Sequence, residues 1–148
     1  MMDVALPEVT EPTNPIEDVE TVISSLAEPD SAQVSHVEQG HLWRFRYGTA
    51  QVYVQLTGTS TDDMLTVWAG LLKLPVQNPL ALYQQLLELN WATTMEARFA
   101  ILDQEVVVVG TRSLLGLDPA EIARLITIVA SLADLYDEEL QAKFPAAA

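Results

Sequence analysis

Two stretches of alternating apolar and polar residues, separated by a two-residue turn, form the clearest pattern in the chain. The stretches span residues 43–47 and 50–56, and Gly48-Thr49 lies between them. Alternation of this kind is typical of half-buried β-strands. Glycine readily takes the positive φ that the first central position of a type II′ turn requires. The pattern therefore predicts a β-hairpin with a defined register.

This register assigns one apolar face and one polar face to the hairpin. The apolar pairs are Tyr47 with Ala50, Phe45 with Val52, and Trp43 with Val54; the polar pairs are Arg46 with Gln51 and Arg44 with Tyr53. Two of the seven basic residues of the chain are thus predicted to stand side by side on a rigid sheet. We interpret this polar face as a candidate recognition surface.

Three helix starts are marked by an N-cap residue followed by proline. They are Asn14-Pro15, Asn78-Pro79 and Asp118-Pro119, and Glu121 adds a capping-box residue to the third. Apolar residues recur at helical spacing after each start. The predicted stripes are Ile16, Val19, Val22, Ile23 and Leu26 in the first helix, Leu80, Tyr83, Leu86 and Leu87 in the second, and Ile122, Leu125, Ile126, Val129, Leu132, Ala133, Tyr136 and Leu140 in the third. Such stripes usually pack against a core.

The other strands are predicted from turn residues and alternation. Residues 33–38 turn at Gln39-Gly40 into the Trp43 strand, residues 64–74 follow a loop at 57–63, and residues 95–101 connect through Asp103-Gln104 to residues 105–109. Four consecutive valines at 106–109 imply a strand covered on both faces, by a helix of this chain or by another subunit. The predicted fold class is α+β, an antiparallel β-sheet meander with helices on one side, in the order α-β-β-β-β-α-β-β-α.

The chain has 148 residues, which is enough for one domain with a single core. Residues 1–13 combine Pro7 and Pro12 with acidic and small residues and lack periodicity, so we expect a disordered acidic tail. The domain is expected at residues 14–144, followed by a disordered C-terminal tail at 145–148.

Charge and composition argue against several classes of partner. The formal net charge of -14 repels nucleic-acid phosphates and anionic lipid headgroups. The absence of cysteine removes thiolate chemistry and suits a reducing compartment. The first residues lack the pattern of a leader, and no apolar stretch has the length of a membrane span. We expect a cytoplasmic protein that binds neither nucleic acid nor membranes.

No arrangement for catalysis is visible in the sequence. His36 and His41 flank a turn near Trp43 without a carboxylate or cysteine to complete a metal site, so we interpret them as core or rim residues. Residues 60–63 lack the spacing of a calcium loop. Glycine-rich nucleotide motifs and the G-x-S-x-G nucleophile motif are absent. We therefore expect a non-enzymatic protein with no cofactor and no metal.

Aromatic and basic residues supply the candidate binding site. Most strand aromatics, Trp68 and Phe99 among them, are assigned to the inner face, whereas Tyr53 is expected to stand outward against Arg44 and to stack on its guanidinium. The candidate partner-binding residues are Arg44, Arg46, Tyr53 and Arg98. An equally good alternative for Arg44 and Arg46 is a solubilising role or ion pairs with Glu96 and Glu38.

Four stretches resemble the YbjN-domain family, in particular its cyanobacterial branch. They are W-R-F-R-Y-G-T-A-Q-V-Y-V-Q-L at 43–56, L-L-E-L-N-W at 86–91, E-A-R-F-A-I-L at 96–102 and V-V-V-V-G-T-R at 106–112. The resemblance runs from about residue 14 to about residue 144 and contains no catalytic signature. It implies a fold like that of type III secretion chaperones and a binding module that acts as a chaperone, assembly factor or regulator. Some cyanobacterial relatives are associated with assembly of carboxysome shell proteins.

Three hypotheses for function follow. The leading one is a small cytosolic assembly chaperone or regulatory factor that holds an extended or terminal segment of a client protein, for which a carboxysome shell protein is one candidate. The outer sheet face and an edge strand would form the site. The second is a structural or regulatory homodimer without a client, with the valine strand and the third helix in contact through Val107, Val109 and Arg112. The third is an enzyme whose site is assembled from distant residues.

Overall fold

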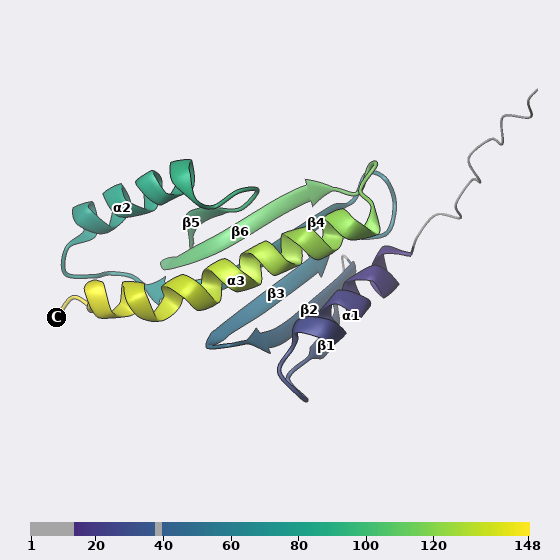
Figure 1. Cartoon of the computed structure of the whole chain (residues 1–148), viewed down its shortest axis with the longest axis horizontal. Helices are drawn as coiled ribbons and strands as arrows, with labels where there is room; N and C mark the ends of the chain where they lie inside the picture. Colours follow the sequence, from purple (N-terminus) through teal and green to yellow (C-terminus); the bar gives the residue numbers. More distant parts are fainter. Residues whose placement is uncertain (1–13, 38–39) are drawn as a thin grey trace, which may run out of the picture.

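Six antiparallel strands form one sheet, and three helices pack on one side of it (Figure 1). This computed structural model describes residues 14–37 and 40–148, so the expected tail at 1–13 and the predicted turn residue Gln39 lie outside the described residues. The elements are α1 (Pro15–Leu26), β1 (Gln33–Val37), β2 (Gly40–Tyr47), β3 (Ala50–Leu56), β4 (Met64–Lys73), α2 (Pro79–Ala92), β5 (Arg98–Leu102), β6 (Glu105–Ser113) and α3 (Pro119–Lys143). The predicted α+β class and element order are confirmed.

The strands are arranged in the order β1-β2-β3-β4-β6-β5, and each neighbouring pair is antiparallel. β1 and β5 are therefore the edges of the sheet. α3 contacts β2, β3, β4 and β6, α1 packs on α3 and β2, and α2 packs on β5. Figure 1 shows α3 running along the sheet, with α1 near β1 and β2. We call the helix-covered side the inner face and the opposite side the outer face.

The central hairpin has the predicted register. Gly48 has a φ of 57°, as the first central position of a type II′ turn requires, and all five predicted residue pairs occur. Trp43 and Phe45 are 3% and 0% exposed, whereas Arg44 and Arg46 at the alternate positions are exposed. The hairpin thus separates a buried face of the sheet from an open one.

α1 and α3 pack on the inner face through the stripes that the sequence predicts. α1 buries Val19 and Ile23, and α3 buries every predicted stripe residue except the half-buried Tyr136. Gly110 of β6 allows α3 to approach closely, because a Cβ there would lie 2.4 Å from a methyl carbon of Leu125. Burial of these apolar side chains is the main stabilising contribution to the fold.

The predicted stripe of α2 is wrong for two of its four residues. The buried residues of this helix are Leu82 and Leu86, whereas Leu80 and Leu87 are 80% and 68% exposed. Leucines occupy nearly every side of α2, so the 3.6-residue spacing fits more than one face. Packing against β5 and the core decides which side is buried, and periodicity does not report that choice.

Two of the three predicted N-cap residues make the expected side-chain hydrogen bond to the first turn of their helix. Asn14 accepts a hydrogen bond from the Ile16 N–H at 3.0 Å, and Asp118 accepts one from the Glu121 N–H at 2.8 Å. Asn78 makes no such side-chain bond. The carboxylate of Glu121 forms an ion pair with Arg112, so the predicted capping box is not the contact that this side chain makes.

The turn of the central hairpin is fastened to α3 by two carboxylates, Asp134 and Asp137. Asp134 accepts a hydrogen bond from the Thr49 N–H at 2.9 Å. The Thr49 hydroxyl donates to Asp137, 2.7 Å from its nearer oxygen, and Asp137 is only 5% exposed. Gly48 leaves room for this contact, since a Cβ there would lie 2.0 Å from an Asp134 oxygen. The turn therefore fixes the hairpin against the last half of α3.

The end of the chain, expected to be a tail, pairs with the segment before α2. The Gln77 N–H donates to the Pro145 carbonyl at 3.0 Å, and the Ala147 N–H donates to the Pro75 carbonyl at 3.1 Å. Val76 and Ala146 form a β-bridge between them. These bonds connect the C-terminal end of α3 to the approach to α2.

Replacing either buried aromatic of β2 should destabilise the protein strongly. Trp43→Ala or Phe45→Ala should cost about 3–5 kcal/mol in the free energy of unfolding, because each leaves a cavity on the inner face. Arg44→Ala should change that free energy by less than about 0.5 kcal/mol, because its side chain is exposed. Urea titration measures all three, and the reverse ranking would contradict the assignment of faces.

Loss of the Thr49 hydroxyl should also be costly. Thr49→Val keeps the shape of the side chain but leaves the buried Asp137 without this donor, so we expect a loss of about 1–3 kcal/mol. Thr49→Ser retains the hydroxyl and is the matched control. If urea titration gave the same stability for the valine and serine variants, the hydrogen bond to Asp137 would not be what fastens the turn.

Candidate protein-binding face

One residue from each of the six strands lies in a single row across the outer face. Successive cross-strand partners form this central row, which consists of Gln33, Arg44, Tyr53, Trp68, Val109 and Arg98. Arg44 and Arg98 stand four strand spacings apart, or about 19 Å at about 4.8 Å per spacing. Three of the four predicted partner-binding residues therefore share one row, with an arginine on each side of an aromatic and apolar centre. Arg46 lies on the same face, two residues along β2 from Arg44.

Two stacked aromatic rings form the middle of the central row. The ring centroids of Tyr53 and Trp68 are 5.3 Å apart, and their planes differ by 12°. Trp68 therefore lies on the outer face, and its assignment to the inner face is wrong, because Leu65, Val67 and Ala69 take the inward positions of β4. The ring partner of Tyr53 is Trp68 rather than Arg44.

The guanidinium of Arg44 takes part in a different contact from the predicted one. It donates a hydrogen bond to the side-chain oxygen of Gln33 on the neighbouring strand. The predicted alternative partner Glu96 is bound to Arg124 at 2.8 Å, and Glu38 lies outside the described residues. Arg44 therefore keeps its charge at the surface, beside the aromatic pair.

A shallow depression of about 350 Å³ opens beside the aromatic pair on the outer face. The residues that line it are Gln55, Thr66, Trp68, Ala100, Ile101, Leu102, Val107 and Val109. Val107 is only 3% exposed although no described helix packs on this face, so its neighbours on the sheet cover it. The depression gives this face an apolar floor between the two ends of the central row.

The outer face is basic although the chain is strongly acidic. Four of the seven basic residues occupy it: Arg44, Arg46 and Arg98 around its centre, and Lys73 at one end. Among the described residues, the ion pairs use Arg112 and Arg124, each bound to a glutamate. The outward positions of the described strands carry one acidic residue, Glu105, opposite Lys73 at one end of the sheet. A segment with carboxylates therefore meets attraction here and repulsion over most of the remaining surface.

The residues predicted for a dimer or groove contact do not lie together. Val107 and Val109 face outward from β6, whereas Arg112 is the cross-strand partner of the inward-facing Leu65 and pairs with Glu121 of α3 at 3.3 Å. β6 is an interior strand, hydrogen-bonded to β4 and β5 on its two sides. It therefore has no free edge for a second copy of the chain.

The two edges of the sheet differ in how open they are. On β5, the side-chain amide of Asn90 accepts a hydrogen bond from the Phe99 N–H at 2.7 Å and donates to the Phe99 carbonyl at 3.3 Å. This pair of bonds occupies backbone groups that a further strand would need. Within the described residues, β1 pairs only with β2. The β1 edge is therefore the more open of the two.

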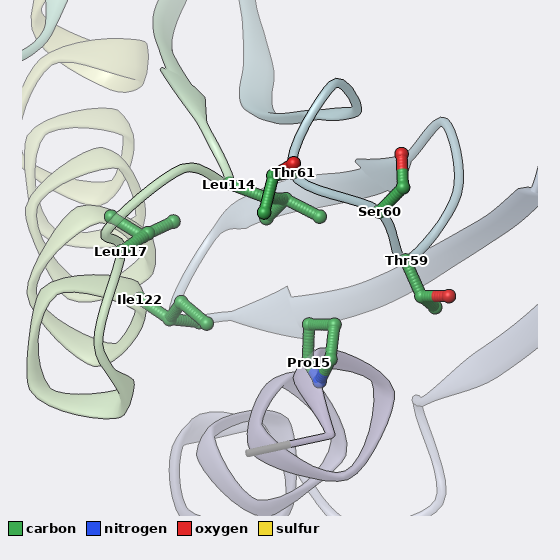
Figure 2. A pocket seen from close by; sticks show the side chains of 7 residues that line it. All are labelled: Pro15, Thr59, Ser60, Thr61, Leu114, Leu117 and Ile122. Carbon is green, nitrogen blue, oxygen red and sulfur yellow. The ribbon is translucent and has the colours of Figure 1, made fainter. Parts of the chain in front are cut away.

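A second cavity, of about 250 Å³, lies between the start of α1, the loop after β3 and the start of α3 (Figure 2). Figure 2 shows Leu117 and Ile122 on one side of it and Pro15, Thr59 and Ser60 on the other. The loop after β3, which lines part of this cavity, contains Asp63, and the carboxylate of Asp63 is hydrogen-bonded within the loop. The Asp63 carboxylate accepts hydrogen bonds from the hydroxyl and N–H of Ser60 and from the hydroxyl of Thr57, and these bonds lower the pKa of Asp63.

The described residues contain no group of three histidine, aspartate or glutamate side chains placed to hold a metal ion. His41 lies on the inner face, where its ring stacks on Trp43 with centroids 5.5 Å apart. The side chain of His36 lies outside what the structure describes. The predicted place of His41 near Trp43 is confirmed.

Comparison with known proteins identifies a family over most of the chain. Residues 15–142 match the YbjN family model, whose description is "Putative bacterial sensory transduction regulator". No curated protein matches the chain. None of the described helices is both long and apolar enough to span a membrane. The family match supports the resemblance drawn from the four sequence stretches.

The lowered pKa of Asp63 can be tested directly. In an NMR titration, the Asp63 carboxyl should protonate at a lower pH in the folded protein than in an unfolded peptide of the same sequence. The stabilisation that this carboxylate gives is therefore present above the unfolded pKa and is lost as the pH falls through the folded pKa. Ser60→Ala should raise the Asp63 pKa, whereas Thr59→Ala, which removes no bond to Asp63, should leave it unchanged. An equal effect of both substitutions would contradict the assigned hydrogen bonds.

Proposed function

The chain belongs to the YbjN family, and we propose that it is a non-enzymatic protein-binding module that holds an extended or terminal segment of a client protein. The family description names a sensory transduction regulator, and a role in binding another protein is compatible with it. The outer face of the sheet is the proposed site, with Arg44, Arg46, Tyr53 and Arg98 as the residues that select the client. The protein would need no cofactor and no metal for this role.

The central row is the observation that carries the proposal. It places a stacked aromatic pair and an apolar depression between Arg44 on one side and Arg98 on the other. Aromatic residues and arginine are the side chains that contribute most at protein interfaces. The arginines on the two sides of the row can pair with carboxylates of a client segment, while the aromatic and apolar centre contacts an apolar side chain of that segment.

The charge of the whole chain favours a particular kind of client segment. A net charge of -14 repels acidic segments over most of the surface, so a segment that carries a carboxylate is attracted only near the three arginines of the outer face. Aspartate, glutamate or a terminal carboxylate can form charge-assisted hydrogen bonds with a guanidinium. We expect a client segment in which such a group flanks an apolar residue.

β1 is the edge at which an extended segment would add to the sheet. Strand addition uses unpaired backbone groups for affinity and side-chain contacts for selectivity. Asn90 occupies backbone groups of Phe99 on β5, whereas β1 is open within the described residues. A segment on β1 would lie beside Gln33 and Arg44, at one end of the central row.

The resemblance to cyanobacterial relatives narrows the proposal further. We propose a small cytosolic assembly chaperone or regulatory factor with a fold like that of type III secretion chaperones. A carboxysome shell protein is one client to test, since some cyanobacterial relatives are associated with shell assembly. The general proposal of client binding on the outer face does not depend on this particular client.

Reversal of two arginines should abolish client capture. Arg44→Glu combined with Arg46→Glu removes the attraction for a carboxylate and adds repulsion, while both side chains are exposed and their loss should leave the melting temperature nearly unchanged. The wild type and this double variant are used as baits in the same native lysate. Recovered clients are then measured at low and high salt, and binding should weaken as the screening length falls from about 10 Å at 0.1 M to about 3 Å at 1 M.

Lys73→Glu combined with Lys143→Glu is the matched control, because it makes the same change in net charge away from the centre of the outer face. This control should capture the client as the wild type does. Equal recovery by all three baits would contradict the proposed role of the outer face.

A further inference from the structure

α2 carries an exposed apolar stripe on the side that faces away from its buried leucines. Leu80, Leu87 and Trp91 are 80%, 68% and 93% exposed. At about 100° per residue, these three side chains lie within an arc of about 40° seen down the helix axis. Leu82 and Leu86, the buried residues of α2, point to the opposite side. The helix is therefore apolar on two sides, and only one of them is covered by its own chain.

The size of this stripe sets it apart from ordinary exposed leucines. Single exposed apolar residues are common on folded proteins, but a contiguous patch on the order of a few hundred Å² usually marks an interaction site. A nearly fully exposed tryptophan is a large part of such a patch, because each tryptophan side chain offers about 150–250 Å². Met95, 67% exposed, follows shortly after the end of α2, and its sulfur lies 3.8 Å from a guanidinium nitrogen of Arg124.

We infer that the α2 stripe is the site at which a second copy of this chain docks, with the two α2 helices packed antiparallel across a twofold axis. Charge is the first argument. The 14 residues of α2 contain one charged side chain, Glu88, whose carboxylate accepts a hydrogen bond from Gln84 at 3.0 Å. Two copies that each carry -14 repel one another, so they can meet best where acidic groups are scarce.

The uncharged stripe also indicates what kind of surface it fits. A basic partner would require acidic groups in the contact, and the stripe offers none besides the hydrogen-bonded Glu88 at its flank. The best complement is another apolar and nearly neutral surface, and α2 of a second copy has that character. A twofold contact is self-complementary by construction, so one stripe serves both partners.

The spacing of the stripe fits a twofold axis near the middle of α2. An axis between Gln84 and Leu87 would place Trp91 of one copy beside Leu80 of the other. The contact would extend over about 16 Å, given a rise of about 1.5 Å per residue. A contact that extends over only about 16 Å buries a small area, near the lower limit of about 1,200 Å² for specific complexes. The dimer should therefore be reversible, with a dissociation constant on the order of micromolar.

This dimer would leave free the end of the proposed client site that carries Arg44 and Arg46. α2 packs on β5, at the opposite end of the strand order from β1, and its stripe points away from the buried side. Arg44 and Arg46 lie on β2, next to the open edge. The inference therefore stands independently of the proposed function, and each can fail without the other.

The test is the mass of the full chain in solution, measured by light scattering or sedimentation from low micromolar to several hundred micromolar concentration. The wild type should pass from monomer to dimer as concentration rises. Leu87→Gln combined with Trp91→Gln should raise the dissociation constant by about tenfold or more, since buried tryptophan is a common hot-spot residue. Added salt should strengthen the dimer, because it screens the repulsion between two acidic copies.

Leu115→Gln combined with Leu135→Gln is the matched control. These leucines are 71% and 62% exposed but lie outside α2, so this variant should dimerise as the wild type does. All four substituted residues are exposed, and circular dichroism should give the same melting temperature for the three proteins. A wild type that stays monomeric at every concentration would overturn the inference and assign the stripe to a different partner. Equal dimerisation of the α2 variant and the wild type would overturn it as well.

The absence of cysteine from the chain allows a test of the antiparallel arrangement. Gln84→Cys and Leu87→Cys variants are prepared separately and then oxidised alone or as a mixture. Across the proposed axis, position 84 of one copy faces position 87 of the other, so the mixture should form more disulfide-linked dimer than either variant alone. Less cross-linking in the mixture than in the separate samples would contradict the antiparallel contact.

Discussion

Packing of α3 on one face of the sheet is the interaction on which the rest of the molecule depends. This helix buries ten residues, contacts four of the six strands, and receives the hairpin turn through Asp134 and Asp137. Because α1 and α2 add to the same side, the opposite side of the sheet is left without a helix over it. The open outer face is therefore a consequence of one-sided packing. Its residues do not have to be apolar to pack against a helix, so they can serve binding.

The parts of the fold that could be predicted from sequence are those in which local pattern and tertiary packing agree. Alternation around Gly48 fixes the hairpin register, because a shift of one residue would move Trp43 and Phe45 into solvent. The stripes of α1 and α3 are each confined to one side, and the structure buries that side. α2 shows the limit of this reasoning. Its leucines lie on two sides, and only the three-dimensional packing decides that Leu82 is buried and Leu80 is not.

The candidate site depends more on long-range topology than the hairpin register and the helix stripes do. Hairpin register is enough to place Arg44 and Tyr53 on the polar face, since both belong to adjacent strands. Arg98 joins the same row only because β6 inserts between β4 and β5, an arrangement that no local pattern reports. The interpretation of Trp68 as an inner-face residue rests on the frequent burial of large aromatics, whereas the alternation of Leu65, Val67 and Ala69 on β4 indicates the outward direction. The turn contact between Thr49 and Asp137 spans 88 positions in the sequence and has no local signal.

An acidic chain of this kind can form attractive contacts only where its own acidic residues are absent. Two described surfaces meet that condition in different ways: the outer face carries arginines around an aromatic centre, and the α2 stripe is apolar and nearly uncharged. Electrostatic attraction at the first surface weakens with salt, whereas apolar contact at the second persists and like-charge repulsion between copies declines. If both surfaces act together, a dimer presents two client sites, and a client with repeated segments would be held far more tightly than one site allows. Added salt would then favour dimerisation and weaken the binding of each client segment, because it screens the repulsion between two copies and also the attraction between arginines and carboxylates.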